Sequence, residues 1–171
     1  NPNGIAGSVM QQLNHGISTG MLFLVVGVMY ERRHTREISE YGGLAHRMPL
    51  FATVFAFAVL SSAGLPLLNG FVGEFTILQG AFEASRLAAS LAVIGVILGA
   101  AYLLWLYQRT TLGQITNMKN NHLPDLSPRE LAVFAPLVIW AFSIGLYPKP
   151  YFEMIERPVA RIVERVRPGY F

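Results

Sequence analysis

The sequence predicts an all-α integral membrane protein with about four transmembrane helices, one of them interrupted, and a C-terminal amphipathic helix. Three observations support this fold class. Hydrophobic residues make up 53% of the chain and charged residues only 13%, against a usual charged share of about 25%. Several long segments carry no charge, and the one from Met48 to Gly73 contains glycine and proline that break helices. The chain has no cysteine, which excludes disulfides and thiolate-bound metal or iron–sulfur sites.

The first expected span covers residues 4–30, which carry no formal charge and are long enough to cross a hydrocarbon core of about 30 Å. Its first half is unusually polar, and four polar residues share one helical face: Gln11, His15, Ser18 and Thr19. This face should look into protein or a hydrated path, because lipid cannot satisfy such groups. Two interpretations remain open. The face is a polar stripe that hydrogen-bonds between helices, or it includes a proton path through His15, since histidine titrates near neutral pH.

The second expected crossing is interrupted. Its two pieces, 49–64 and 69–82, are each shorter than the ~20 residues that a span needs. The helix should stop near Gly64, because glycine adopts the left-handed turn that ends helices and Pro66 cannot continue the hydrogen-bond ladder. The two pieces therefore make one crossing with a break inside it.

The helix is expected to restart at Asn69, whose side chain is predicted to cap the new N-terminus. Glu74 then lies about one turn into the second piece. A carboxyl group beside a helix break at membrane depth indicates ion or proton transfer. The alternative is a glutamate that hydrogen-bonds the backbone groups freed by the break.

Two plain spans and an amphipathic tail follow. The span at 87–107 has a stripe of small residues, typical of close helix packing: Ala88, Ala92, Gly95 and Gly99. The span at 131–147 is preceded by a predicted capping box of Ser127 and Glu130. In the tail, apolar residues recur at spacings of three and four, which predicts a helix lying on a membrane surface or on a neighbouring subunit.

With four crossings, the loops 31–48 and 109–130 share one side of the membrane. They contain seven of the arginine and lysine residues: Arg32, Arg33, Arg36, Arg47, Arg109, Lys119 and Arg129. Positive charge in short loops favours the cytoplasmic side, so we expect both loops to be cytoplasmic.

Four motifs follow one another in order: Asn14-His15-Gly16, then Tyr30-Glu31-Arg32-Arg33-His34-Thr35-Arg36, then Gly64-Leu65-Pro66, then Asn69-Gly70-Phe71-Val72-Gly73-Glu74-Phe75. They resemble the C-terminal third of subunit M of the proton-translocating NADH:quinone oxidoreductases (respiratory complex I), which is chain 4 in mitochondria. The broken-helix motif recurs across the antiporter-like superfamily. The charged loop and a glutamate at position 74 are more specific to subunit M, whose sister subunits usually have lysine there. We therefore expect the chain to be a piece of a longer protein.

The resemblance implies a membrane subunit that takes part in proton translocation coupled to remote NADH oxidation and quinone reduction. Residues 1–149 would form the C-terminal part of its antiporter-like transmembrane domain, and residues 150–171 a surface tail. Glu74 and His15 would be the catalytic, proton-transferring residues. The chain would count as an enzyme only as a non-redox, proton-pumping subunit of the complex.

The resemblance also implies that this chain holds no cofactor, with NADH, FMN, iron–sulfur clusters and quinone on partner subunits. Expected partners are other membrane subunits, especially the sister antiporter-like subunits, and the lipid bilayer, but not nucleic acid. The expected location is the bacterial inner (plasma) membrane, in a multi-pass arrangement. Two other hypotheses are a subunit of a multisubunit cation/proton antiporter or membrane-bound hydrogenase, and a purely structural membrane scaffold.

Overall fold

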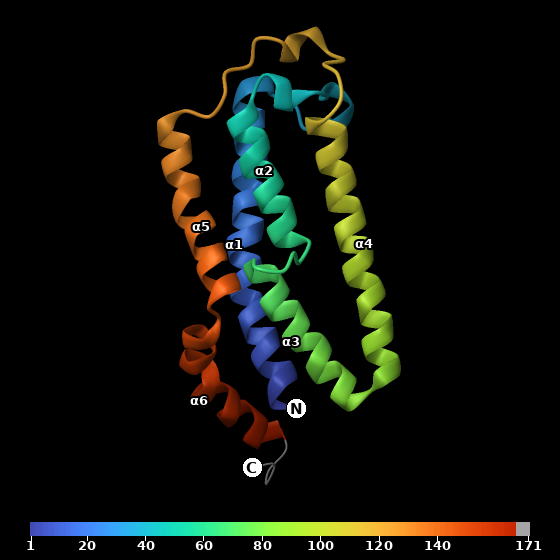
Figure 1. Ribbon diagram of the computed structural model, residues 1–171, viewed down its shortest axis with the longest axis vertical. Coiled ribbons are helices and arrows are strands. Elements are labelled where there is room, and N and C mark those ends of the chain that lie inside the picture. The colour runs from blue at the N-terminus through green and yellow to red at the C-terminus, as the bar shows by residue number, and fades with distance from the viewer. Residues whose placement is uncertain (167–171) are drawn as a thin grey trace.

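The computed structural model describes residues 1–166, which form helices and loops without any strand. The α-helices are α1 (Pro2–Arg33), α2 (Pro49–Ser62), α3 (Asn69–Ala84), α4 (Arg86–Thr111), α5 (Pro128–Leu146) and α6 (Lys149–Val166). Three short 3-10 helices lie in the loops, at Ile38–Glu40, Leu44–His46 and Met118–Asn120. The long helices run side by side and alternate in direction, while α6 crosses one end of the bundle (Figure 1).

The chain crosses the membrane four times. Helices α1, α4 and α5 are each long and apolar enough to span a membrane, and α2 is a shorter apolar helix. Figure 1 shows α2 and α3 following one another along the bundle, so that together they make one crossing with a break in the middle. The predicted fold class, an all-α integral membrane protein with one interrupted helix, is confirmed.

Local sequence determines where the helices begin. Pro49 occupies the first turn of α2, a position where its missing N–H group has no helical partner to lose. The predicted capping box starts α5, because the Ser127 hydroxyl accepts from the Glu130 backbone N–H (3.3 Å) and the Glu130 carboxylate accepts from the Ser127 N–H (2.7 Å). Helix α1 begins at Pro2, two residues earlier than expected, and the Asn1 side chain caps it by accepting from the Gly4 N–H at 2.9 Å.

Helix α1 packs most extensively against α3. Glycines bring the two backbones into contact, since a Cβ atom added to Gly7 would lie 2.6 Å from the Ile77 nitrogen, and one added to Gly80 would overlap the Gly4 backbone. The small-residue stripe of α4 behaves differently. Nothing in the described chain lies within 4 Å of a Cβ atom added to Gly95 or Gly99. Within the described residues, therefore, these two glycines do not pack α4 against another helix, and the expectation of close packing stays a prediction.

The two charged loops lie at the same end of the bundle (Figure 1), as the four crossings require. They also bind each other, because Arg33 donates to the Asn120 side chain at 2.8 Å and the Asn117 side-chain amide donates to the Glu40 carboxylate at 2.7 Å. At the opposite end, α6 is strongly amphipathic and buries Val159 and Val163. The predicted tail helix is thus present at 149–166 and packs against α1, whereas residues 167–171 of the predicted tail lie outside the described residues.

Candidate functional site

The helix break follows the predicted pattern. Helix α2 ends at Ser62, and Gly64 has a φ of 75°, the left-handed conformation that glycine adopts at low cost. The chain then turns through Leu67, which has a φ of 77° despite its side chain. Such a conformation is uncommon for a non-glycine residue, so the linker is held in shape by the helices around it. Helix α3 begins at Asn69.

The predicted capping role of Asn69 is wrong. The N-cap position of α3 is Leu68, and no side chain caps it. The fully buried Asn69 side chain instead joins three helices, because its amide donates to the Asn14 carbonyl oxygen (3.1 Å) and its oxygen accepts from the Ser61 hydroxyl (2.6 Å). Fully buried polar atoms need such partners, and α1 and α2 supply them here.

Asn14 is a site residue that the sequence reasoning missed. Its side chain is fully buried and donates to the Asn69 carbonyl oxygen at 2.7 Å. The available signal was a polar amide one position before His15, in the segment 4–30 that carries no formal charge. Asn14 lies three positions after Gln11 and four before Ser18, so helical spacing places it at the edge of the same polar face.

Glu74 is half-buried one turn into α3, beside the helix break. The Gln11 amide donates to its carboxylate at 3.4 Å. On the other side the carboxylate lies against Gly64, where an added Cβ atom would collide with Glu74 Oε2. In the described chain the hydrogen-bond partner of Glu74 is thus a side chain of α1 and not a backbone group freed by the break, which disfavours the alternative role as a backbone cap.

A polar cavity of about 130 Å³ joins Glu74 to the polar face of α1. All four residues of that face line it: Gln11, His15, Ser18 and Thr19. Helix α2 adds Ser61 and Ser62, and α4 adds Tyr102, which the sequence reasoning did not include. The structure therefore brings the two predicted site residues, Glu74 and His15, to one cavity.

His15 lies at the edge of this cavity and is exposed in the described chain. The Thr19 hydroxyl lies 3.2 Å from its ring nitrogens, one turn further along α1. Imidazole, carboxyl and hydroxyl groups can each accept and release protons, so the cavity has the chemistry of a proton relay. Within residues 1–166, no three His, Asp or Glu side chains converge as metal ligands would.

Comparison with known proteins identifies one family. A sequence model described as NADH:quinone oxidoreductase/Mrp antiporter, TM matches residues 1–99. NADH-quinone oxidoreductase subunit M of Rhodobacter capsulatus is 45% identical over 164 residues, which cover 96% of this chain and 32% of that protein. The chain spans about a third of the length of the curated relatives it matches.

Two solved structures share the fold. One is respiratory complex I from Thermus thermophilus with bound NADH, with a TM-score of 0.85 and 36% identity over 98% of this chain and 35% of the matching chain. The other is the Mrp complex from a Dietzia species, with a TM-score of 0.81 and 21% identity over 99% of this chain and 39% of that chain. At 21% identity, the second likeness concerns the fold alone.

Proposed function

This chain belongs to the NADH:quinone oxidoreductase/Mrp antiporter transmembrane family, and on that premise we propose that it is part of a proton-translocating membrane subunit of an NADH:quinone oxidoreductase. Glu74 is the proposed proton-exchange carboxyl and His15 its relay partner. The observation that carries this proposal is the cavity that Glu74 and His15 line together beside the break between α2 and α3.

Two findings favour the oxidoreductase over a cation/proton antiporter. The subunit M relative is 45% identical, and the matching chain of the complex I structure is 36% identical. The Mrp likeness, at 21% identity, supports only the architecture that such proteins share. An antiporter subunit without redox partners therefore stands second.

The proposed transfer needs only groups that can hold a proton at membrane depth. A cavity of about 130 Å³ corresponds to roughly four water molecules at ~30 Å³ each. Hydroxyl groups of Ser18, Thr19 and Ser62 line it and can hydrogen-bond to such a chain of water. A proton would pass along it between the imidazole of His15 and the carboxyl of Glu74, and Glu74 would release it again when its surroundings change.

The energy for this transfer would come from elsewhere in the assembly. We propose that NADH, FMN, iron–sulfur clusters and quinone are bound by partner subunits, since this chain has no cysteine to ligate a cluster. The proposed partners are other membrane subunits, including sister antiporter-like subunits. Because the Rhodobacter relative is bacterial, the proposed location is the bacterial inner membrane.

The experiment that tests this function uses the full-length subunit with Glu74→Gln in inverted membrane vesicles. NADH oxidation and NADH-driven acidification of the lumen are followed together, and native gels report assembly. Glu83→Gln is the matched control, because Glu83 is an exposed carboxylate near the other end of the same helix.

Loss of acidification in an assembled Glu74→Gln complex, with normal acidification in Glu83→Gln, is the expected result. Slower NADH oxidation should accompany it if the two processes are tightly coupled. Unchanged oxidation and acidification would reject the role of Glu74 and favour a structural scaffold. Sodium-dependent transport that needs no NADH would favour the antiporter.

A further inference from the structure

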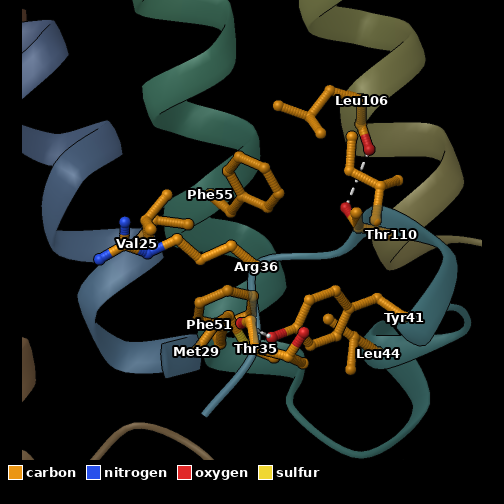
Figure 2. Close-up of a pocket in the computed structure, with 12 residues that line it drawn as sticks. Val25, Met29, Thr35, Arg36, Tyr41, Leu44, Phe51, Phe55, Leu106 and Thr110 are labelled. Carbon is orange, nitrogen blue, oxygen red and sulfur yellow. Dashed lines mark hydrogen bonds between the residues drawn. The ribbon is translucent and has the colours of Figure 1, made fainter. Parts of the chain in front are cut away.

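An apolar pocket lies where α1, α2 and α4 meet the first charged loop, separate from the proton-transfer cavity (Figure 2). Its volume is about 270 Å³, and its walls include Val25, Met29, Phe51, Phe55 and Leu106. Apolar cavities of about 150 Å³ stay dry and take up small hydrocarbons. A pocket of this size and lining therefore favours an apolar ligand over water.

The hydroxyl groups in the wall do not change this conclusion. Tyr41 donates to the Thr35 carbonyl oxygen at 2.7 Å, and Thr110 donates to the Leu106 carbonyl oxygen at 2.9 Å (Figure 2). The third hydroxyl in the wall, that of Thr35, accepts from the Glu37 backbone N–H at 3.2 Å, so all three hydroxyl groups have partners within the protein. Water would find few polar partners here, and it needs two to four.

The pocket lies at the loop end of the membrane-spanning helices, and this position corresponds to headgroup depth in a bilayer that they cross. It is built from the last turns of α1 and α4, the first turns of α2, and the loop after α1. In Figure 1 these segments meet at the end of the bundle where the charged loops gather. A ligand here would have hydrocarbon on one side and the polar boundary on the other.

Arg36 provides a positive charge at this pocket. Figure 2 shows its side chain extended along the pocket toward Val25, and its guanidinium carbon lies 5.0 Å from the centroid of the Tyr30 ring. The neighbouring Arg32 and Arg33 pair with Glu130 and Glu40. No carboxylate of the described chain pairs with Arg36, which is exposed.

We propose that this pocket is a phospholipid site, in which one acyl chain fills the apolar pocket and the phosphate binds Arg36. An apolar pocket with one unpaired guanidinium at headgroup depth complements a molecule that has a hydrocarbon tail and an anionic head. Guanidinium binds phosphate oxygens through paired N–H groups. A polypeptide segment in the same place would have to bring its own anion to Arg36. The site is independent of the proton-transfer role of Glu74.

The test uses the full-length subunit in its assembled complex and phosphatidylglycerol with a photoreactive diazirine on one acyl chain. After illumination, mass spectrometry maps the labelled peptides. Two variants probe the two halves of the site: Arg36→Gln removes the phosphate partner, and Val26→Trp fills the pocket from a wall residue that is 46% exposed. Arg109→Gln is the matched control, since Arg109 is an exposed arginine that stacks on Trp105 at the same end of the bundle.

The expected result is labelling of the pocket segments of α1, α2 and α4 in the wild type. Arg36→Gln and Val26→Trp should each reduce it roughly tenfold, the factor for about 1.4 kcal/mol of lost binding, while Arg109→Gln leaves it unchanged. Native gels confirm assembly of each variant. Pocket labelling that neither variant reduces would overturn the proposal. So would a wild-type pocket that takes no lipid label, as is expected if polypeptide fills it.

Discussion

Asn14 and Asn69 each donate a hydrogen bond to the other's backbone carbonyl oxygen, at 2.7 and 3.1 Å. Both side chains are completely buried, and they lie 55 positions apart in the sequence. The pair ties the middle of α1 to the first residue of α3. The helix break is therefore fixed beside Asn14 of α1. Glu74, five residues further along α3, is fixed relative to α1 in the same way.

Replacing either asparagine by alanine should destabilise the subunit by about 1–3 kcal/mol, because each change removes a buried hydrogen bond between α1 and α3, and Asn69→Ala also leaves the buried Ser61 hydroxyl without its acceptor. Thermal unfolding of the purified full-length subunit measures this loss. The double variant should lose less than the sum of the two single losses, since the two hydrogen bonds act as a unit. Strictly additive losses would show that the two asparagines are independent.

Arg32 joins the end of α1 to the start of α5. Its guanidinium donates to both carboxylate oxygens of Glu130, at 2.8 and 2.9 Å. It also donates to the carbonyl oxygens of Val28, Pro124 and Asp125, so all five N–H groups of the guanidinium are used. The Asp125 carboxylate in turn accepts from the first backbone N–H groups of α2, those of Leu50 and Phe51.

Arg32→Lys should lower the melting temperature of the subunit nearly as much as Arg32→Gln, because an ammonium group cannot form the forked contact with Glu130. The expected loss is about 1–3 kcal/mol in either case, since the ion pair is only partly exposed. Arg129→Gln, at an exposed neighbour of Glu130, is the control and should cost little. If Arg32→Lys were as stable as the wild type, the positive charge alone would account for the contribution of Arg32, and the forked contact with Glu130 would not matter.

Gly145 of α5 lies against the linker between α2 and α3. A Cβ atom added to Gly145 would overlap the Leu67 carbonyl oxygen and crowd Leu68. Gly145→Ala should therefore displace the linker and cost roughly 1–3 kcal/mol, read as a lower melting temperature. Gly95→Ala is the control, because Gly95 has open space around it in the described chain. Equal losses in both variants would show that α4 packs closely against a partner outside the described residues.

Structural features that depend on residues close together in the sequence could be predicted from it. The break depends on Gly64 and Pro66, and the start of α5 on a serine and a glutamate three residues apart. The polar face of α1 follows from helical periodicity alone, and it does line the cavity with Glu74.

Features that depend on distant partners could not be predicted in the same way. Asn69 resembles an N-cap in sequence, yet its partners Asn14 and Ser61 lie on other helices. Tyr102 reaches the cavity only because α4 runs beside the break. The small-residue stripe of α4 indicates close packing, but sequence does not say which surface would face it.

Gln11 positions the carboxylate of Glu74 and yields the last prediction. Its amide donates to Glu74 across the contact between α1 and α3 at 3.4 Å, and a hydrogen bond of this length does not rule out a catalytic role in a resting site. Gln11→Leu keeps a side chain of similar size and removes this donor. Proton pumping by the assembled complex should fall several-fold without the complete loss expected of Glu74→Gln, because the carboxyl itself remains.

The measurement is NADH-driven acidification in inverted vesicles, with Gln12→Leu, at the exposed neighbouring position, as the control. Equal acidification by the Gln11 and Gln12 variants would mean that Glu74 needs no positioning by α1, and that the geometry of the helix break alone places it.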